Sequence, residues 1–129
     1  MSCSDIVELF REDMYASIDV EYLPEDVKEL FYRYVDALLD NVCEYVSNVL
    51  ERIERSGEYV AQLSFAGMCE RYLRNSIFNL CSGDVNCVDT ALGLCSEIDA
   101  SYTVLISRLL QRHGYTTRIV GHATLQVFK

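Results

Sequence analysis

Residues 24–56 read PEDVKELFYRYVDALLDNVCEYVSNVLERIERS, and this stretch decides the fold of the chain. Pro24 suits the first position of a helix, and the acids that follow it complement the positive end of the helix dipole. Apolar residues recur at helical spacing throughout, at Phe31, Val35, Leu38, Val42, Tyr45 and Val49, with Leu39, Cys43, Val46, Leu50 and Ile53 beside them. The pattern predicts one helix of about nine turns, which ends at Ser56-Gly57.

An apolar stripe this wide is not stable alone and must be covered by other elements. Periodicity and turn residues predict four further helices, over residues 4–18, 58–80, 85–98 and 102–113. The tight turn at Ser56-Gly57 makes the helices before and after it antiparallel neighbours. The helix over 102–113 is apolar on most sides, so we expect it to be the most buried. The predicted core includes Val42, Val46, Leu50, Leu73, Leu105 and Leu109.

The C-terminal segment, residues 115–128, changes to β-branched and aromatic residues, which predicts a β-hairpin. Gly121-His122 fits a two-residue turn that pairs Val120 with Ala123. This register places Tyr115, Thr117, Ile119 and Phe128 on one face. Because an isolated two-stranded ribbon is marginally stable, we expect the bundle to cover one face and a partner chain the other.

Length and composition indicate one domain over residues 1–129, a mainly α-helical five-helix bundle organised on the long helix about 24–56, with the hairpin about 115–128. Half of the 129 residues are hydrophobic, which argues against disorder. The longest apolar runs are about five residues, too short to cross a bilayer, so we expect no membrane partner. The first nine residues lack the features of a signal peptide, and we expect a cytoplasmic protein.

The charge is unevenly distributed along this acidic chain. Its net charge is −9, and all 20 acidic residues lie at or before Asp99. From Ala100 onward the only charged residues are Arg108, Arg112, Arg118 and Lys129. This basic tail either packs on the acidic body or attracts an anion such as nucleic acid.

Six cysteines make the chain cysteine-rich. No CxxC pair is present, so a zinc site has little support. Buried free thiols and disulfides both remain open, and disulfides in a cytoplasmic protein would indicate an archaeal or viral origin from a hot environment. If the helices before and after Ser56-Gly57 form a hairpin, Cys43 and Cys69 lie level, and they are the candidate disulfide.

The last third has the element order of a winged helix-turn-helix. Helix 85–98, a turn at residues 99–101, helix 102–113 and the hairpin follow one another. In that arrangement the nucleic-acid contacts would come from Arg108, Arg112, Arg118 and His122. The apolar character of helix 102–113 counts against it, because a recognition helix needs an exposed polar face.

No catalytic, cofactor-binding or metal-ligating motif stands out, so we expect no enzyme and no cofactor. The sequence favours a small interaction or regulatory module that binds a protein partner or self-associates as a homodimer. Its subunit interface would include Tyr115, Ile119 and Phe128 of the hairpin. A winged-helix nucleic-acid-binding protein is the alternative.

Overall fold

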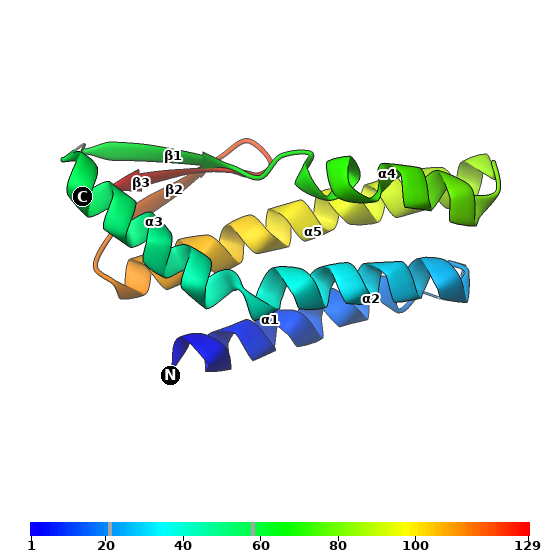
Figure 1. Cartoon of the computed structure of the whole chain (residues 1–129), viewed down its shortest axis with the longest axis horizontal. Coiled ribbons are helices and arrows are strands. Elements are labelled where there is room, and N and C mark those ends of the chain that lie inside the picture. The colour runs from blue at the N-terminus through cyan, green and yellow to red at the C-terminus, as the bar shows by residue number, and fades with distance from the viewer. Residues whose placement is uncertain (21, 58) are drawn as a thin grey trace.

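The computed structural model describes residues 1–20, 22–57 and 59–129. Its elements are α1 (Cys3–Ile18), α2 (Glu25–Asp40), α3 (Val42–Ser56), β1 (Val60–Ser64), α4 (Met68–Cys81), α5 (Val85–Arg112), β2 (Thr116–Val120) and β3 (Thr124–Phe128). In Figure 1, α1 and α2 form one layer, α4 and the sheet form another, and α5 runs between them along the length of the molecule. The predicted mainly α-helical bundle with a C-terminal hairpin is confirmed.

The centre of the core is α5, a helix of 28 residues. It contacts α1, α3, α4, β2 and β3, and most residues from 102 to 110 are buried, while Arg108, Gln111 and Arg112 remain exposed along one side. Leu105, Ile106 and Leu110 are fully buried, as the apolar character of residues 102–113 predicted. A helix that is apolar around most of its circumference is stable only in such an enclosed position.

The predicted turn at residues 99–101 is wrong, because α5 continues through it. Asp99 looked like a capping residue for its own helix, but its carboxylate caps a different one. Its Oδ1 accepts a hydrogen bond of 3.1 Å from the backbone N–H of Cys69, in the first turn of α4. The helix-turn-helix part of a winged helix is therefore absent from the described residues.

The single helix predicted over residues 24–56 is also wrong, since it is interrupted at Asn41. This residue has φ −108° and ψ 1°, and it separates α2 from α3. Figure 1 shows α3 turning away from the line of α2 toward the sheet. The apolar stripe continues across the break through Leu39 and Val42, both buried, so hydrophobic periodicity alone does not reveal the change in direction.

The helix predicted over residues 58–80 is replaced by strand β1 and the shorter helix α4; Glu58 itself lies outside the described residues. Ala61, Leu63 and Phe65 alternate with exposed or polar residues at the period of a strand. β1 pairs with β3 in an antiparallel register. Gly67, with φ +72°, then starts α4 in a backbone conformation that favours glycine. The predicted antiparallel helix pair around Ser56-Gly57 therefore does not form.

The hairpin is confirmed, but its register differs by one residue. Val120 pairs with Thr124 instead of Ala123, and Ile119 pairs with Leu125. Phe128 pairs with Thr116, so it lies on the opposite face from Ile119, contrary to the prediction. The sheet order is β1-β3-β2, which means that β1 of the same chain covers the β3 edge.

All six cysteines form disulfides: Cys3–Cys43, Cys69–Cys95 and Cys81–Cys87. The predicted Cys43–Cys69 bond is wrong, because the helix pair that would place these residues level is absent. Cys3–Cys43 instead joins the start of α1 to the start of α3, directly after the break at Asn41. Each of the three bonds joins the end of one helix to another helix.

Five of the six predicted core residues are buried, and Leu50 is only partly buried. The buried face of α3 consists of Val42, Val46, Val49 and Ile53, which turns Leu50 toward the edge of the core. Among the described residues, no helix is long and apolar enough to cross a membrane.

Non-reducing peptide mapping tests the disulfide pattern. Trypsin places Cys3, Cys43 and Cys69 on separate peptides, because arginines lie between them in the sequence. We expect Cys3 to be linked to Cys43, and Cys69 to the peptide that contains Cys95. A Cys43–Cys69 peptide pair in mass spectra would contradict this fold.

Truncation of the core tests the central position of α5. Leu105→Ala should lower the free energy of unfolding by about 2–5 kcal/mol, because it leaves a cavity at a fully enclosed site. Leu50→Ala is the matched control and should cost clearly less, since Leu50 is already partly exposed. Urea unfolding of the oxidised protein measures both. Equal losses for the two variants would show that α5 is not the core.

Candidate interaction surfaces

The most buried ionisable group is Asp99, whose side chain holds the start of α4. The residue is 2% exposed. Burial raises the pKa of its carboxyl above the ordinary value, and hydrogen bonds from the backbone N–H groups of Cys69 and Gly67 oppose that rise. Such an acid serves as a cap that satisfies helix N–H groups inside the protein, where water cannot. It is not accessible to a substrate in solvent.

The hydroxyl of Tyr34 is a second buried polar group. It has no hydrogen-bond partner among the described residues. Burial raises the pKa of this hydroxyl, and the nearby Asp99 carboxyl acts in the same direction. The described residues contain no group of three or more His, Cys, Asp or Glu side chains placed to hold a metal ion.

The four predicted nucleic-acid contacts do not share one surface. Arg108 lies over the ring of Phe10, 5.2 Å from its centroid, and Arg112 donates a hydrogen bond to the carbonyl oxygen of Met1. His122 lies 2.7 Å from the carbonyl oxygen of Ser96, near the middle of α5. Arg118 lies between Thr117, which contacts α5, and Ile119, so alternation along the strand turns it to the outer face of the sheet.

The predicted interface residues are also separated. Ile119 is 41% exposed on the edge strand β2, and Tyr115 and Phe128 are partly buried. Phe128 lies on the outer face of the sheet, opposite Ile119. The hairpin therefore presents single apolar side chains and not the continuous face that the sequence predicted.

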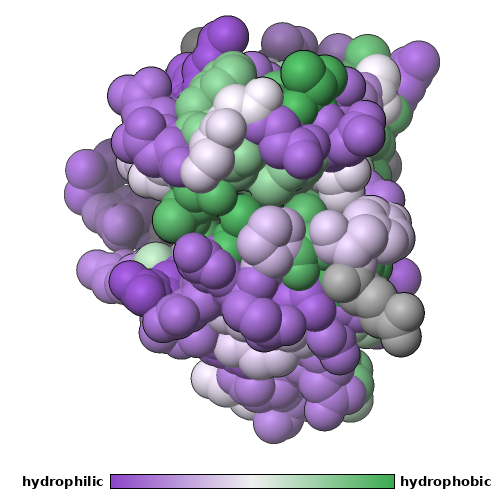
Figure 2. All heavy atoms as spheres, turned by 90° about the vertical axis from the view of Figure 1, so that its right-hand side faces the viewer, coloured by the Kyte–Doolittle hydropathy of each residue, from purple (hydrophilic) through white to green (hydrophobic). Residues whose placement is uncertain are grey.

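A larger apolar surface lies at one end of the molecule, where the α1–α2 loop meets the α4–α5 turn. We call it the apolar end, and define it by exposed Tyr22, Phe78 and Val85 with partly buried Leu30, Leu80 and Leu92. Figure 2 views this end directly and shows apolar residues in the centre with hydrophilic residues around them. Two surface hollows, one lined by Tyr22 and the other by Phe78, Val85 and Leu92, share Asp89, and Leu30 and Leu80 line a third.

The turn that presents Val85 is fixed by local sequence. Gly83 has φ +78°, and Asp84 caps α5 by accepting a hydrogen bond of 3.1 Å from the backbone N–H of Cys87. The Cys81–Cys87 disulfide closes the same turn. These constraints hold Val85, which is 69% exposed, in a fixed position at the surface.

Carboxylates surround the apolar end. Four of them make no ion pair among the described residues, and we call them the acidic rim: Asp26, Asp84, Asp89 and Glu97. Asp26, Asp89 and Glu97 line the hollows beside the apolar residues, and Asp84 precedes Val85. A partner for this surface would need apolar side chains flanked by positive charge.

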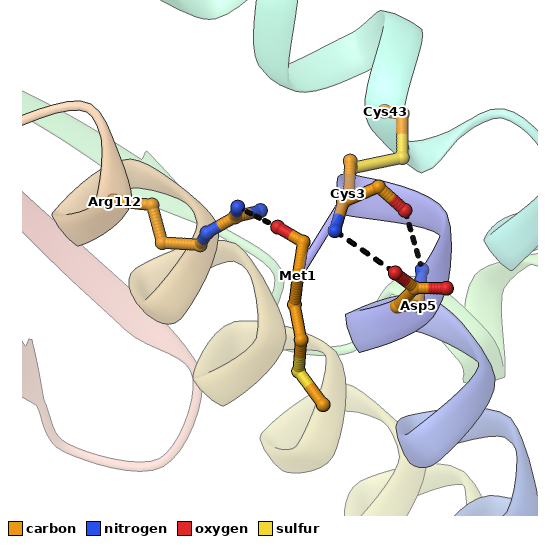
Figure 3. The surroundings of a disulfide bond; sticks show 6 residues. Met1, Cys3, Asp5, Cys43 and Arg112 are labelled. Atoms are coloured by element: carbon orange, nitrogen blue, oxygen red, sulfur yellow. Dashed lines mark hydrogen bonds between the residues drawn. A yellow bond between two sulfur atoms is a disulfide. The ribbon is translucent and has the colours of Figure 1, made fainter.

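A second amphipathic surface lies between α1 and the C-terminal end of α5. We call it the basic groove; it has a volume of about 480 Å³ and is lined by Met1, Ile6, Leu9, Phe10, Arg108, Gln111 and Arg112. Figure 3 shows Arg112 directed toward the carbonyl of Met1, close to the Cys3–Cys43 disulfide that anchors the start of α1.

The two arginines of the groove keep their positive charge available. Neither makes an ion pair with a carboxylate among the described residues, since Arg108 faces an aromatic ring and Arg112 a carbonyl oxygen. The nearby acid is Asp5. Hydrogen bonds from Ser2 lower the pKa of its carboxyl most, and the charge of Arg112 contributes least. The groove is thus a positive site on a chain of net charge −9.

No family model, curated protein or solved structure matches this chain.

The titration of Asp99 gives a testable pH dependence. Because its pKa is raised in the folded state, its contribution to stability is present below the ordinary carboxyl pKa and is lost as the pH rises through the folded value. Asp99→Asn keeps an oxygen acceptor for the Cys69 N–H and does not titrate. The free energy of unfolding of this variant, relative to that of the native chain, should therefore increase as the pH rises from about 4 to 7.

Urea unfolding at several pH values measures this difference. Asp99→Ala is the control, and it should lose about 1–3 kcal/mol because the Cys69 N–H is left buried without an acceptor. The free energy of unfolding of Asp99→Asn minus that of the native chain could instead stay constant or fall as the pH rises. Either result would show that burial does not destabilise the ionised Asp99 carboxylate.

Proposed function

We propose that this protein is a small, non-enzymatic interaction module that binds another protein molecule through its apolar end. The observation that carries the proposal is the exposure of Tyr22 and Val85, at 75% and 69%, within a ring of carboxylates that make no ion pair among the described residues. Contiguous apolar surface bordered by polar residues is typical of protein–protein contacts.

The energy available at this surface is sufficient for binding. Full burial of one large apolar side chain contributes about 1.5–3 kcal/mol. Tyr22 and Val85 are largely exposed, while Phe78 is 42% exposed with the Arg74 guanidinium 5.7 Å from the centroid of its ring, so Phe78 contributes less. Part of this gain offsets the entropy lost on association, so we expect moderate affinity that depends on all three.

The disulfides support the proposal because they fix the surface before binding. Cys81–Cys87 closes the turn beside Val85, and Cys69–Cys95 joins α4 to α5. A surface held in its bound shape loses less conformational entropy when a partner docks. The bonds also explain how a turn with two exposed apolar side chains nearby stays ordered.

The hairpin, which the sequence suggested as the subunit interface, is a weaker candidate than the apolar end. Its β2 edge is unpaired among the described residues, and Ile119 and Val120 are 41% and 39% exposed. However, Arg118 directly precedes them on the same strand, and a charged residue on an edge strand discourages pairing with another chain. The apolar end offers more exposed apolar area and no such obstacle.

The proposal includes that the protein is not an enzyme and binds no cofactor. Its support is that the Asp99 carboxyl and the Tyr34 hydroxyl are shielded from solvent, and that all six cysteines are oxidised. Cytoplasmic location and an archaeal or viral origin stay predictions. They agree with each other, because intracellular proteins of hyperthermophilic archaea are rich in disulfides.

Binding of a designed probe tests the proposal. The probe is a fluorescent amphipathic helical peptide with leucine on one face and lysine on the other, titrated by fluorescence anisotropy. Tyr22→Asp should weaken binding about tenfold or more, because it removes an apolar contact and adds a like charge to the acidic rim.

Tyr72→Asp is the matched control, since Tyr72 is 76% exposed on α4 outside the apolar end. It adds the same charge and should leave the affinity nearly unchanged. Equal losses in the two variants would mean that the peptide responds to overall charge, and the proposed site would be rejected.

A further inference from the structure

We infer that the partner of the apolar end is the basic groove of a second copy of this chain, so that the molecules associate head to tail. The inference rests on the proposed function, because it assigns a partner to the same apolar end.

The two surfaces lie at opposite ends of the same helix. Val85 is the first residue of α5 and Arg112 is the last. A straight helix of this length spans about 40 Å. Figure 1 shows α5 running the length of the molecule, so the two surfaces of one molecule cannot meet. A contact between them requires two copies, and each copy keeps one surface free for the next.

The charges of the two surfaces are complementary. The acidic rim has four carboxylates without ion pairs among the described residues. In the basic groove, Arg108 contacts an aromatic ring and Arg112 a carbonyl oxygen, and neither makes an ion pair among the described residues. The apolar end also carries Arg33 and Arg74, but each pairs with a carboxylate of its own helix, Glu29 and Glu70 respectively. The rim carboxylates have no such partner, so a contact between two apolar ends would bring unpaired carboxylates together, and a contact between two grooves would bring arginines together. The head-to-tail arrangement instead places the rim carboxylates against the arginines of the groove.

Both surfaces also expose apolar side chains that a contact would cover. Tyr22 and Val85 project from the apolar end, with 75% and 69% of their surface exposed. The groove is a depression of about 480 Å³ with an apolar lining, in which Leu9 is 51% exposed and Met1 77% exposed. Projecting apolar side chains of one copy would cover these exposed residues of the next, and the arginines at the groove would meet the carboxylates at the rim.

A head-to-tail contact has a consequence for assembly. A symmetric contact between identical patches stops at a dimer, whereas a contact between two different patches continues until a ring closes or a filament grows. The native chain should therefore form a concentration-dependent series of species. Added salt should shorten the series, because screening weakens the contribution of the charged rims.

A mixing experiment with two variants of the full chain tests the inference. Tyr22→Asp disables the apolar end, and Leu9→Asp disables the groove; both positions are exposed, so the fold should tolerate the changes. Sedimentation velocity is measured on each variant alone and on an equimolar mixture. Each variant alone should be a monomer, with self-association weakened about tenfold or more. The mixture should form dimers and nothing larger, because only one intact pair of surfaces remains.

Tyr72→Asp is the control and should associate as the native chain does. Three results would overturn the inference: a monomeric native chain at about 1 mM, a single variant that still dimerises, or a mixture that stays monomeric. The native chain could be monomeric while Tyr22→Asp still weakens binding of the amphipathic peptide. In that case the head-to-tail contact is wrong and the proposed binding site stands. If neither test responds to Tyr22→Asp, both are wrong.

Discussion

Burial of α5 is the constraint on which the rest of the structure depends. A helix that buries Leu105, Ile106 and Ser107 at successive positions has more than one apolar face to cover, and α1, α3, α4 and the sheet each supply part of the enclosure. The change of direction at Asn41 follows from this need. A straight continuation of α2 would pass along the molecule, whereas the tilted α3 brings Val46 and Val49 into the core.

Hydrophobic periodicity predicted the helix boundaries where local signals were strong. Helix α1 and the hairpin follow from residues near their own ends, with Ser2 as the cap and Gly121 in the turn. It failed where a partner distant in sequence decided the outcome. Asp99 looked like the cap of a new helix because its acceptor role toward Cys69, 30 residues earlier, leaves no trace in local spacing. Leu63 formed a strand because β3 was available to pair with it.

The apolar end was not predicted, for the same physical reason. Tyr22 and Val85 are 63 positions apart in the sequence, and each lies beside a turn that reads as ordinary polar surface. In the sequence each of them is only an apolar residue next to an acid in a connecting segment, which by itself predicts no surface. The antiparallel packing of α1 with α2, and of α4 with α5, brings both turns to one end of the molecule. The basic groove was not predicted for the same reason, since α1 and the end of α5 are far apart in sequence and meet only in the folded chain.

Together these features describe an elongated molecule that presents different chemistry at its two ends. The most direct measurement is a two-dimensional NMR titration, in which isotope-labelled Leu9→Asp receives unlabelled Tyr22→Asp. Only the apolar end of the labelled copy and the groove of the added copy are intact. The account predicts amide shifts confined to the apolar end, around Tyr22, Phe78 and Val85. Shifts centred on the hairpin, residues 115–128, or no shifts at all, would contradict it.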